Sequence, residues 1–197
     1  MNSARCLRLA GVLAASAALL AAGCGSSSTS TSTNAAASQS EAQQAAAGDI
    51  PDNQQFLLYK NRQAGYSVKY PEGWARKGSP NDLTFADKDN QVHIAVSQGS
   101  LPSTAAARAA LERSLPSSAQ LKIKTVQTET ISGQKAIHIT YDKLGPPDPV
   151  TGKRLTLMVD RFVLARGGKV AIVDESTPLG VDNVDAYRLI IESFTWL

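Results

Sequence analysis

The stretch GYSVKYPEGW, residues 65–74, carries the clearest fold signal in the chain. Its large side chains fall at every second position: Tyr66, Val68 and Tyr70. This period is typical of a β-strand with one buried face, so we expect the aromatic side chains to pack inward rather than stack on sugar. Pro71 and Gly73 then fit the second and fourth positions of a type I turn. The stretch predicts a strand, a turn and a further strand that begins at Trp74.

Segments with strand character continue along the chain and are separated by turn residues. They cover residues 83–86, 91–99, 121–131, 134–144, 154–166 and 169–176. Asp87-Lys88-Asp89-Asn90, Ser132-Gly133 and Gly167-Gly168 provide short turns, so neighbouring strands should pair antiparallel. Residues 155–165 place apolar side chains on both faces, which predicts a strand covered on both sides.

Two helices are predicted outside these strands. Residues 103–115 begin with cap-forming hydroxyls, are rich in alanine and end at Pro116, with a stripe of Ala107, Leu111 and Leu115. The last helix should begin at Asp182, with Asp185 in its first turn. Its apolar residues fall at helical spacing: Val184, Tyr187, Ile191 and Phe194. The predicted class is α+β, a central antiparallel sheet of about six or seven strands flanked by helices.

The first 23 residues have the three-part layout of an export signal. Arg5 and Arg8 precede an apolar run that ends in small residues before Cys24, and this run is shorter than a bilayer span. Residues 20–24, LAAGC, resemble the lipobox of bacterial lipoproteins, with Ala21 where leucine is commoner. The resemblance implies cleavage before Cys24 and a diacylglycerol on its thiol; the alternative is ordinary secretion with a free Cys24.

The remaining chain divides into a tether and one domain. Residues 24–50 are rich in Ser, Thr, Ala and Gln, which predicts a flexible linker after the lipidated cysteine. Residues 51–197 are long enough for a single domain with its own core. Removing the signal lowers the formal charge from +3 to +1, which argues against nucleic acid as a partner. The predicted domain contains no cysteine, so its stability must come from packing.

The quoted stretch, together with FLLY at 56–59 and YRLIIESF at 187–194, resembles the PsbP-like family, whose members include bacterial lipoproteins. The resemblance covers roughly residues 56–197. It implies an α-β-α sandwich and a non-enzymatic accessory or binding role at an envelope or membrane surface. Ran-interacting Mog-type proteins and LpqN-type lipoproteins share a similar outline with other roles, so the fold alone does not supply the function.

Candidate catalytic and metal-binding residues are few. The chain has two histidines, His93 and His138, each in the middle of a predicted strand. They would form a metal pair only if their strands were neighbours and further ligands converged, so we interpret both as structural. The motif Gly-x-Ser-x-Gly is missing from the predicted domain, and Asp174 and Glu175 should point to opposite faces of a strand. We therefore predict no catalytic residue, no metal site and no cofactor.

These observations lead to three functional hypotheses. The first is a lipid-anchored accessory or binding protein, held through Cys24 on the outer side of a cell membrane and without catalysis. The second is a carrier of a small apolar or lipid ligand, and the third is an envelope hydrolase, which a pocket joining a histidine to a serine or acid would favour. The polar, proline-containing loop 145–154 is the predicted contact surface for an envelope partner.

Overall fold

The computed structural model of the chain describes residues 48–197. Cys24, the predicted signal and nearly all of the predicted tether lie outside the described residues. The described chain contains ten strands, two α-helices and a short 3-10 helix. Their bounds are β1 Phe56–Asn61, β2 Tyr66–Pro71, β3 Ala75–Ser79, β4 Asp82–Asp87, β5 Asn90–Gln98, α2 Thr104–Ser114, η1 Ser117–Ala119, β6 Lys122–Ile131, β7 Gln134–Pro147, β8 Arg154–Arg166, β9 Lys169–Pro178, α3 Val184–Glu192 and β10 Thr195–Trp196.

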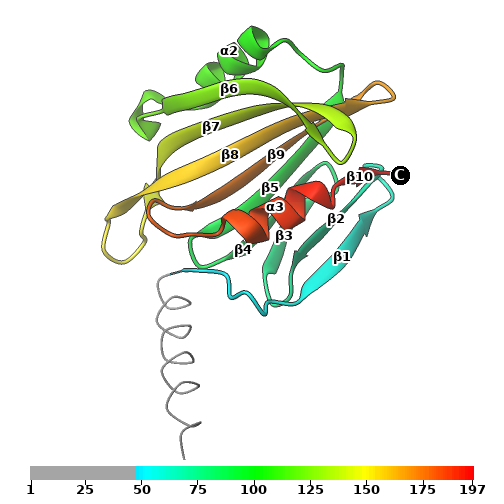
Figure 1. The fold of residues 1–197 in the computed structure, drawn as a ribbon. Coiled ribbons are helices and arrows are strands. Elements are labelled where there is room, and N and C mark those ends of the chain that lie inside the picture. Colours follow the sequence, from blue (N-terminus) through cyan, green and yellow to red (C-terminus); the bar gives the residue numbers. More distant parts are fainter. Residues whose placement is uncertain (1–47) are drawn as a thin grey trace, which may run out of the picture.

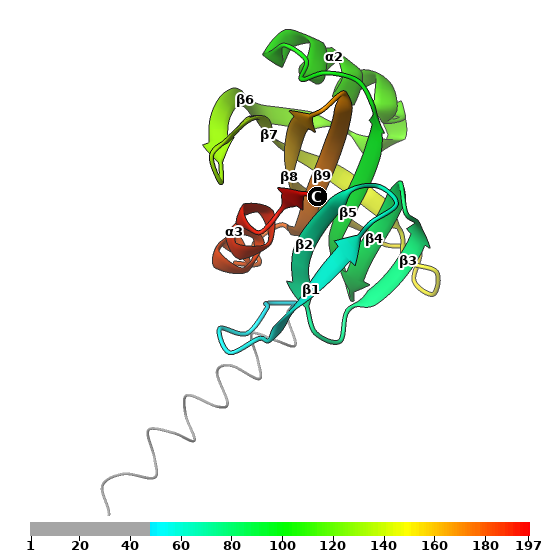
Figure 2. The same cartoon turned by 90° about the vertical axis from the view of Figure 1, so that its right-hand side faces the viewer.

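Seven strands form one antiparallel sheet in the order β3-β4-β5-β9-β8-β7-β6, which confirms the predicted α+β class. A second sheet, β1-β2-β10, was not predicted. Helix α2 lies over β6 and β7 on one face of the large sheet, whereas α3 and the small sheet lie on its other face (Figures 1 and 2). The architecture is therefore layered, with helices on both sides of the sheet.

The turn inside the quoted stretch lies one residue later than the sequence predicts. The amide of Trp74 donates to the carbonyl of Pro71 at 3.3 Å, and Gly73 has φ +91°. Glycine therefore occupies the third position, where a type II turn requires a positive φ. The turn does not close a hairpin, because β2 pairs with β1 and β10 while β3 pairs with β4. It carries the chain from the small sheet into the large one.

Two hydrophobic cores lie on the two faces of the large sheet. The core beneath α3 and the small sheet contains most of the aromatic residues, including Tyr66, Phe85, Phe162 and Phe194. The core beneath α2 contains Leu111, Tyr141, Val159, Val163 and their aliphatic neighbours. Strand β8 contributes to both cores, as its two-sided pattern predicts.

The N-termini of the two helices are formed differently. Ser103 caps α2, since its hydroxyl accepts a hydrogen bond of 3.2 Å from the amide of Ala106. At α3 the N-cap residue is Asn183 rather than the predicted Asp182, and the Asn183 side chain does not bond the helix. Asp182 Oδ1 nevertheless accepts from the amide of Val184 at 3.4 Å, and Asp185 lies in the first turn as predicted. Asn183 instead accepts from the amide of Ile50 at 2.7 Å, which fixes the first described residues beside α3. Within residues 48–197, neither helix has the length and apolar character that crossing a bilayer requires.

Candidate functional site

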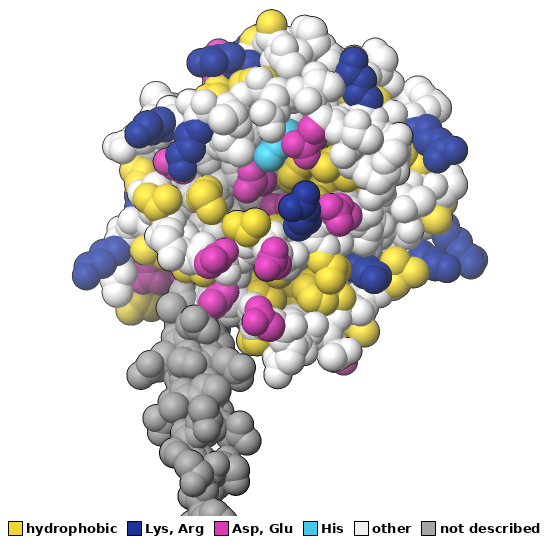
Figure 3. Space-filling view, viewed as in Figure 1, with side chains coloured by type: hydrophobic (Ala, Val, Ile, Leu, Met, Phe, Trp, Pro, Cys, Tyr) yellow, Lys and Arg dark blue, Asp and Glu magenta, His cyan; other side chains and the backbone are white. Residues whose placement is uncertain are grey.

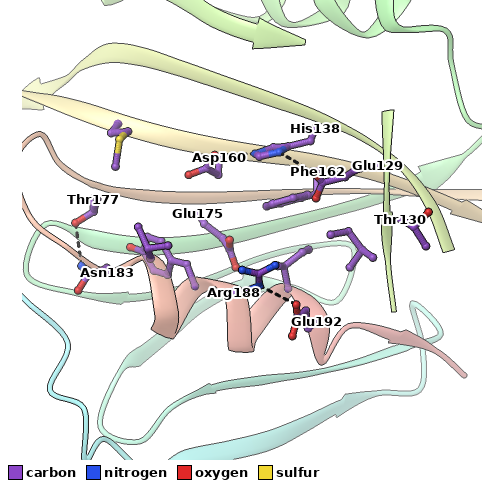
Figure 4. A pocket seen from close by; sticks show the side chains of 15 residues that line it. Glu129, Thr130, His138, Asp160, Phe162, Glu175, Thr177, Asn183, Arg188 and Glu192 are labelled. Atoms are coloured by element: carbon purple, nitrogen blue, oxygen red, sulfur yellow. Dashed lines mark hydrogen bonds and ion pairs between the residues drawn. The ribbon is translucent and has the colours of Figure 1, made fainter. Parts of the chain in front are cut away.

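A cleft of about 370 Å³ lies between α3 and the large sheet, and its walls come from β6, β7, β8, β9 and α3 (Figure 4). The lining residues are Glu129, Thr130, Ile131, His138, Met158, Asp160, Phe162, Glu175, Thr177, Asn183, Val184, Tyr187, Arg188, Ile191 and Glu192. Acidic side chains gather around a histidine on this face of the molecule, beside exposed apolar atoms (Figure 3). The cleft thus combines apolar walls with a small set of charged groups.

Strand register explains why these groups meet. His138 pairs with Phe162 across β7 and β8, and Asp160 pairs with Glu175 across β8 and β9. Paired residues share a face of a sheet, and residues two apart on one strand do so as well. His138, Asp160, Phe162 and Glu175 therefore all point toward α3. Glu129 joins them from β6, where it lies diagonally opposite His138.

His138 is held between two carboxylates. Its Nε2 is 2.7 Å from Asp160 Oδ1, and its Nδ1 is 3.1 Å from Glu129 Oε2. Because ionised carboxylates only accept hydrogen bonds, this geometry suits an imidazolium that donates from both nitrogens. Burial lowers the pKa of His138, but the hydrogen bonds and charges of Asp160 and Glu129 outweigh it and raise the pKa above its ordinary value. The ring also stacks on Phe162, with centroids 4.3 Å apart.

Glu175 is the most deeply buried charged residue of the cleft, with 2% of its surface exposed. Burial, together with the charges of Asp160 and Asp174, raises its pKa well above the ordinary value. Its Oε1 is buried and has no hydrogen-bond partner among residues 48–197. A buried polar atom without a partner is costly, so this oxygen is a notable feature of the site.

The outer rim of the cleft is formed by α3. Arg188 donates from Nε to Glu192 Oε1 at 3.0 Å, and both side chains are largely exposed. Deeper on the same helix, the hydroxyl of Tyr187 donates to the carbonyl of Ser176 at 2.6 Å. This bond ties α3 to β9, so the helix is fixed in position above the strands.

The two histidines do not meet. His93 lies opposite Asp174 in register, on the sheet face away from α3, whereas His138 points into the cleft. His93 Nε2 bonds Asp82 Oδ1 at 2.8 Å instead. Asp174 and Glu175 also point to opposite faces, as the strand period predicts: Asp174 pairs with Arg161, and Glu175 lines the cleft. Among the described residues, no three His, Cys, Asp or Glu side chains gather in a way that could hold a metal ion.

The other regions singled out from sequence lie away from the cleft. Tyr66 and Trp74 are buried in the core, and Tyr70 stacks on Phe85, so the aromatic set packs inward as predicted. The loop 145–154 is shorter than expected, because β7 extends to Pro147. It borders a separate hollow together with the turn at residues 88–91 and contributes nothing to the cleft.

Sequence reasoning missed the acidic residues of the cleft and treated His138 as a structural residue. One signal was available: Glu129 and His138 lie on either side of the Ser132-Gly133 turn, so a tight hairpin brings them together. Asp160 and Glu175 required the full register of β7, β8 and β9. Arg188 and Glu192 required knowledge of which helix face meets the sheet.

His138 is not free to act as a general base in the cleft as arranged. Both nitrogens of His138 are engaged by carboxylates, so the ring presents no free lone pair to act as a general base. Among the described residues that line the cleft, none is a serine or cysteine that could serve as a nucleophile beside it.

No family model matches the chain, and no curated protein matches it. Among solved structures, the cyanobacterial PsbP of Synechocystis sp. PCC 6803 is similar over 73% of this chain and 94% of that chain, with 18% identity and a TM-score of 0.55. The Ran-binding protein Mog1p of Saccharomyces cerevisiae aligns over 73% of this chain and 96% of its own, with 7% identity and a TM-score of 0.47. The first of these likenesses supports a PsbP-like fold.

Proposed function

We propose that the chain is a lipid-anchored, extracytoplasmic binding protein without catalytic activity, and that it holds a small, largely apolar ligand in the cleft between α3 and the sheet. The proposal of a bound ligand rests on the cleft itself. Its volume falls within the range of small-molecule sites, and its apolar walls surround a few converging polar groups.

The rigidity of the cleft supports a binding role. Four of its walls are adjacent strands of one sheet, and Tyr187 ties the fifth wall, α3, to β9. A site that is already formed needs little ordering when the ligand arrives, which favours affinity. Carriage of a small ligand is thus favoured over the envelope hydrolase, since no serine or cysteine lines the described cleft beside His138.

The anchor part of the proposal rests on sequence, through the lipobox-like segment before Cys24. Two or more acyl chains hold a protein firmly at a bilayer, whereas one chain binds only marginally. Cys24→Ser should leave the full chain at its precursor mass and release it from the lipid-anchored fraction. A Cys24→Ser variant that still carries lipid and has lost its signal would contradict lipid anchoring through Cys24. The proposal of a ligand in the cleft would be unaffected by that result.

Methionine provides a direct probe of the cleft. The chain has two methionines, Met1 in the predicted signal and Met158 in the cleft wall, so a methyl-labelled sample reports the site through Met158. Hexan-1-ol added to the full chain in lipid nanodiscs should shift the Met158 methyl signal saturably. Absence of a saturable shift would argue against a ligand site there.

Two tryptophan variants on α3 make the test specific. Val184 lines the cleft and is 60% exposed, whereas Leu189 on the same helix is 38% exposed and lies outside the cleft. Val184→Trp should narrow the cleft and weaken hexan-1-ol binding about fivefold or more, corresponding to roughly 1 kcal/mol. Leu189→Trp should bind as the original chain does. Equal binding by both variants would place the alcohol elsewhere.

A further inference from the structure

Carboxyl groups outnumber cationic groups among the residues that line the cleft. Glu129, Asp160 and Glu175 come from three strands, and the imidazolium of His138 is the cation between the first two. The guanidinium of Arg188 bonds Glu192 at the exposed rim. The interior of the cleft is thus acidic, with Glu175 at its most buried point.

Asp160 would make ionisation of Glu175 costly in the empty cleft. The two residues lie directly opposite each other in the β8–β9 register, where like charges destabilise a sheet. Glu175 Oε1 is also buried without a partner in the described chain. A hydrogen-bond donor that carries positive charge would satisfy that oxygen and offset the charge of Asp160 at the same time.

The remaining walls specify the rest of the ligand. Phe162, Tyr187 and Ile191 are buried, and Met158, which also lines the cleft, is partly buried. The apolar chain or ring of a ligand would be removed from water when it packs on these side chains. A small polar head group on the same ligand would reach Glu175. A carboxylate or phosphate head would instead meet uncompensated negative charge.

We infer that the cleft binds a protonated amine joined to an apolar chain or ring, with the ammonium group donating to Glu175 Oε1. This inference rests on the proposed function, because it names the ligand class of the same cleft. A metal ion is not the required cation, since no three suitable side chains gather among residues 48–197.

Binding should release a proton. Burial and the charges of Asp160 on β8 and Asp174 on β9 raise the pKa of Glu175 well above its ordinary value, so the empty cleft favours the protonated carboxyl. From α3, the hydroxyl of Tyr187 donates to Ser176 and the Nε of Arg188 donates to Glu192, while His138 on β7 bonds Glu129 on β6. An ammonium group beside Glu175 favours its ionised form, and the carboxyl proton passes to the buffer.

Hexylamine and hexan-1-ol, which share a chain and differ in the head group, test the inference on the full chain in nanodiscs. The Met158 methyl signal should report about tenfold tighter binding of hexylamine than of hexan-1-ol, the usual advantage of a charge-assisted bond. Glu175→Gln should remove this preference and leave hexan-1-ol binding intact. Glu192→Gln, which removes a carboxylate at the exposed rim, should keep most of the preference.

Each outcome decides between the proposals. Equal binding of the two probes, or tighter binding of hexanoate, overturns the amine inference and leaves a ligand cleft in place. Binding of none of the three overturns the proposed function as well. Should Glu175→Gln fail to fold, calorimetry of hexylamine binding to the original chain in buffers of different ionisation enthalpy decides: release of about one proton supports the inference, and no release overturns it.

Discussion

On the sheet face opposite the cleft, the guanidinium of Arg161 donates two hydrogen bonds of 2.6 Å to the carboxylate of Asp174. The two residues pair directly across β8 and β9, and only 12% and 10% of their side chains are exposed. The Arg161 guanidinium also lies over the ring of Tyr141, 5.7 Å from its centroid. The ion pair therefore lies across the central strands β8 and β9, on the face of the sheet that carries the core beneath α2.

Removing one partner of this pair should be far more damaging than removing both. Arg161→Met leaves Asp174 buried without its partner, so we expect a loss of about 3–5 kcal/mol in unfolding free energy. The double variant Arg161→Met with Asp174→Val should recover most of that loss. Urea unfolding of the three proteins measures both effects.

An exposed ion pair provides the control. Arg108 and Glu112 form an i,i+4 pair on α2 with about half of each side chain exposed. Arg108→Met should cost about 0.3–0.5 kcal/mol. If Arg161→Met cost no more than Arg108→Met, burial would not be the reason for the strength of the Arg161–Asp174 pair.

His138 should make the stability of the domain depend on pH. Its pKa is raised in the folded chain, so its stabilising contribution is fully present below the ordinary histidine pKa of about 6.5 and is lost as pH rises through the folded value. The stability advantage of the original chain over His138→Gln should therefore shrink between pH 6 and pH 9. Denaturant unfolding across this range measures it.

Proton NMR titration gives an independent check on this prediction. The chain has two histidines, so the imidazole signals are few and His93→Gln assigns them. The His138 signal should titrate above the ordinary histidine range. A stability advantage that grows with rising pH, or a His138 signal that titrates below that range, would show that burial outweighs Asp160 and Glu129.

Glu175→Gln should stabilise the chain relative to the original at neutral and basic pH. The folded pKa of Glu175 is raised, so above about pH 4.3 the unfolded chain loses this proton while the folded chain keeps it. The unfolding free energy of the original chain therefore falls as pH rises, by about 1.4 kcal/mol for each pH unit until the folded pKa of Glu175 is reached. Glutamine does not titrate and escapes this loss.

Unfolding free energies of both proteins at pH 4 and pH 8 test this prediction. The two chains should have similar unfolding free energies at pH 4, and the variant should be the more stable of the two at pH 8. Glu192→Gln, at an exposed position, serves as the control and should show little change in this difference. If the stability of Glu175→Gln relative to the original chain fell as pH rises, the native carboxyl would be ionised and stabilised in the cleft.

The sequence predicted those features that depend on local period and turn chemistry. Alternation predicted the inward aromatic face at Tyr66 and the two-sided strand β8, and paired glycines predicted the turn at Gly167-Gly168, where φ is +60° and +77°. Each follows from steric rules that act within a few residues of the chain. They were sufficient for the fold class.

Features that depend on long-range pairing were not predictable in the same way. The small sheet joins β2 to β10, with Trp196 opposite Tyr66, although about 130 residues separate them. The cleft likewise needs the register of four strands and the placement of α3 over them. In a single sequence nothing distinguishes Glu175 from an exposed acid, because its burial is decided by those distant partners.

Gly78 should be the least replaceable glycine of the large sheet. It lies in β3 opposite Leu83 with φ +117°, and an added Cβ would stand 2.1 Å from the backbone carbonyl oxygen of Asp82. Alanine there combines backbone strain with a clash that no rotamer relieves, so we expect Gly78→Ala to cost about 3 kcal/mol or more. Gly73 shares the positive φ, at +91°, but has no atom within 4 Å of its added Cβ. Gly73→Ala should therefore cost only about 1 kcal/mol, from strain alone. Denaturant unfolding of the two variants separates the cost of the steric clash from the cost of backbone strain. Equal losses would mean that β3 shifts to accommodate the methyl group and that conformational strain is the whole cost at both positions.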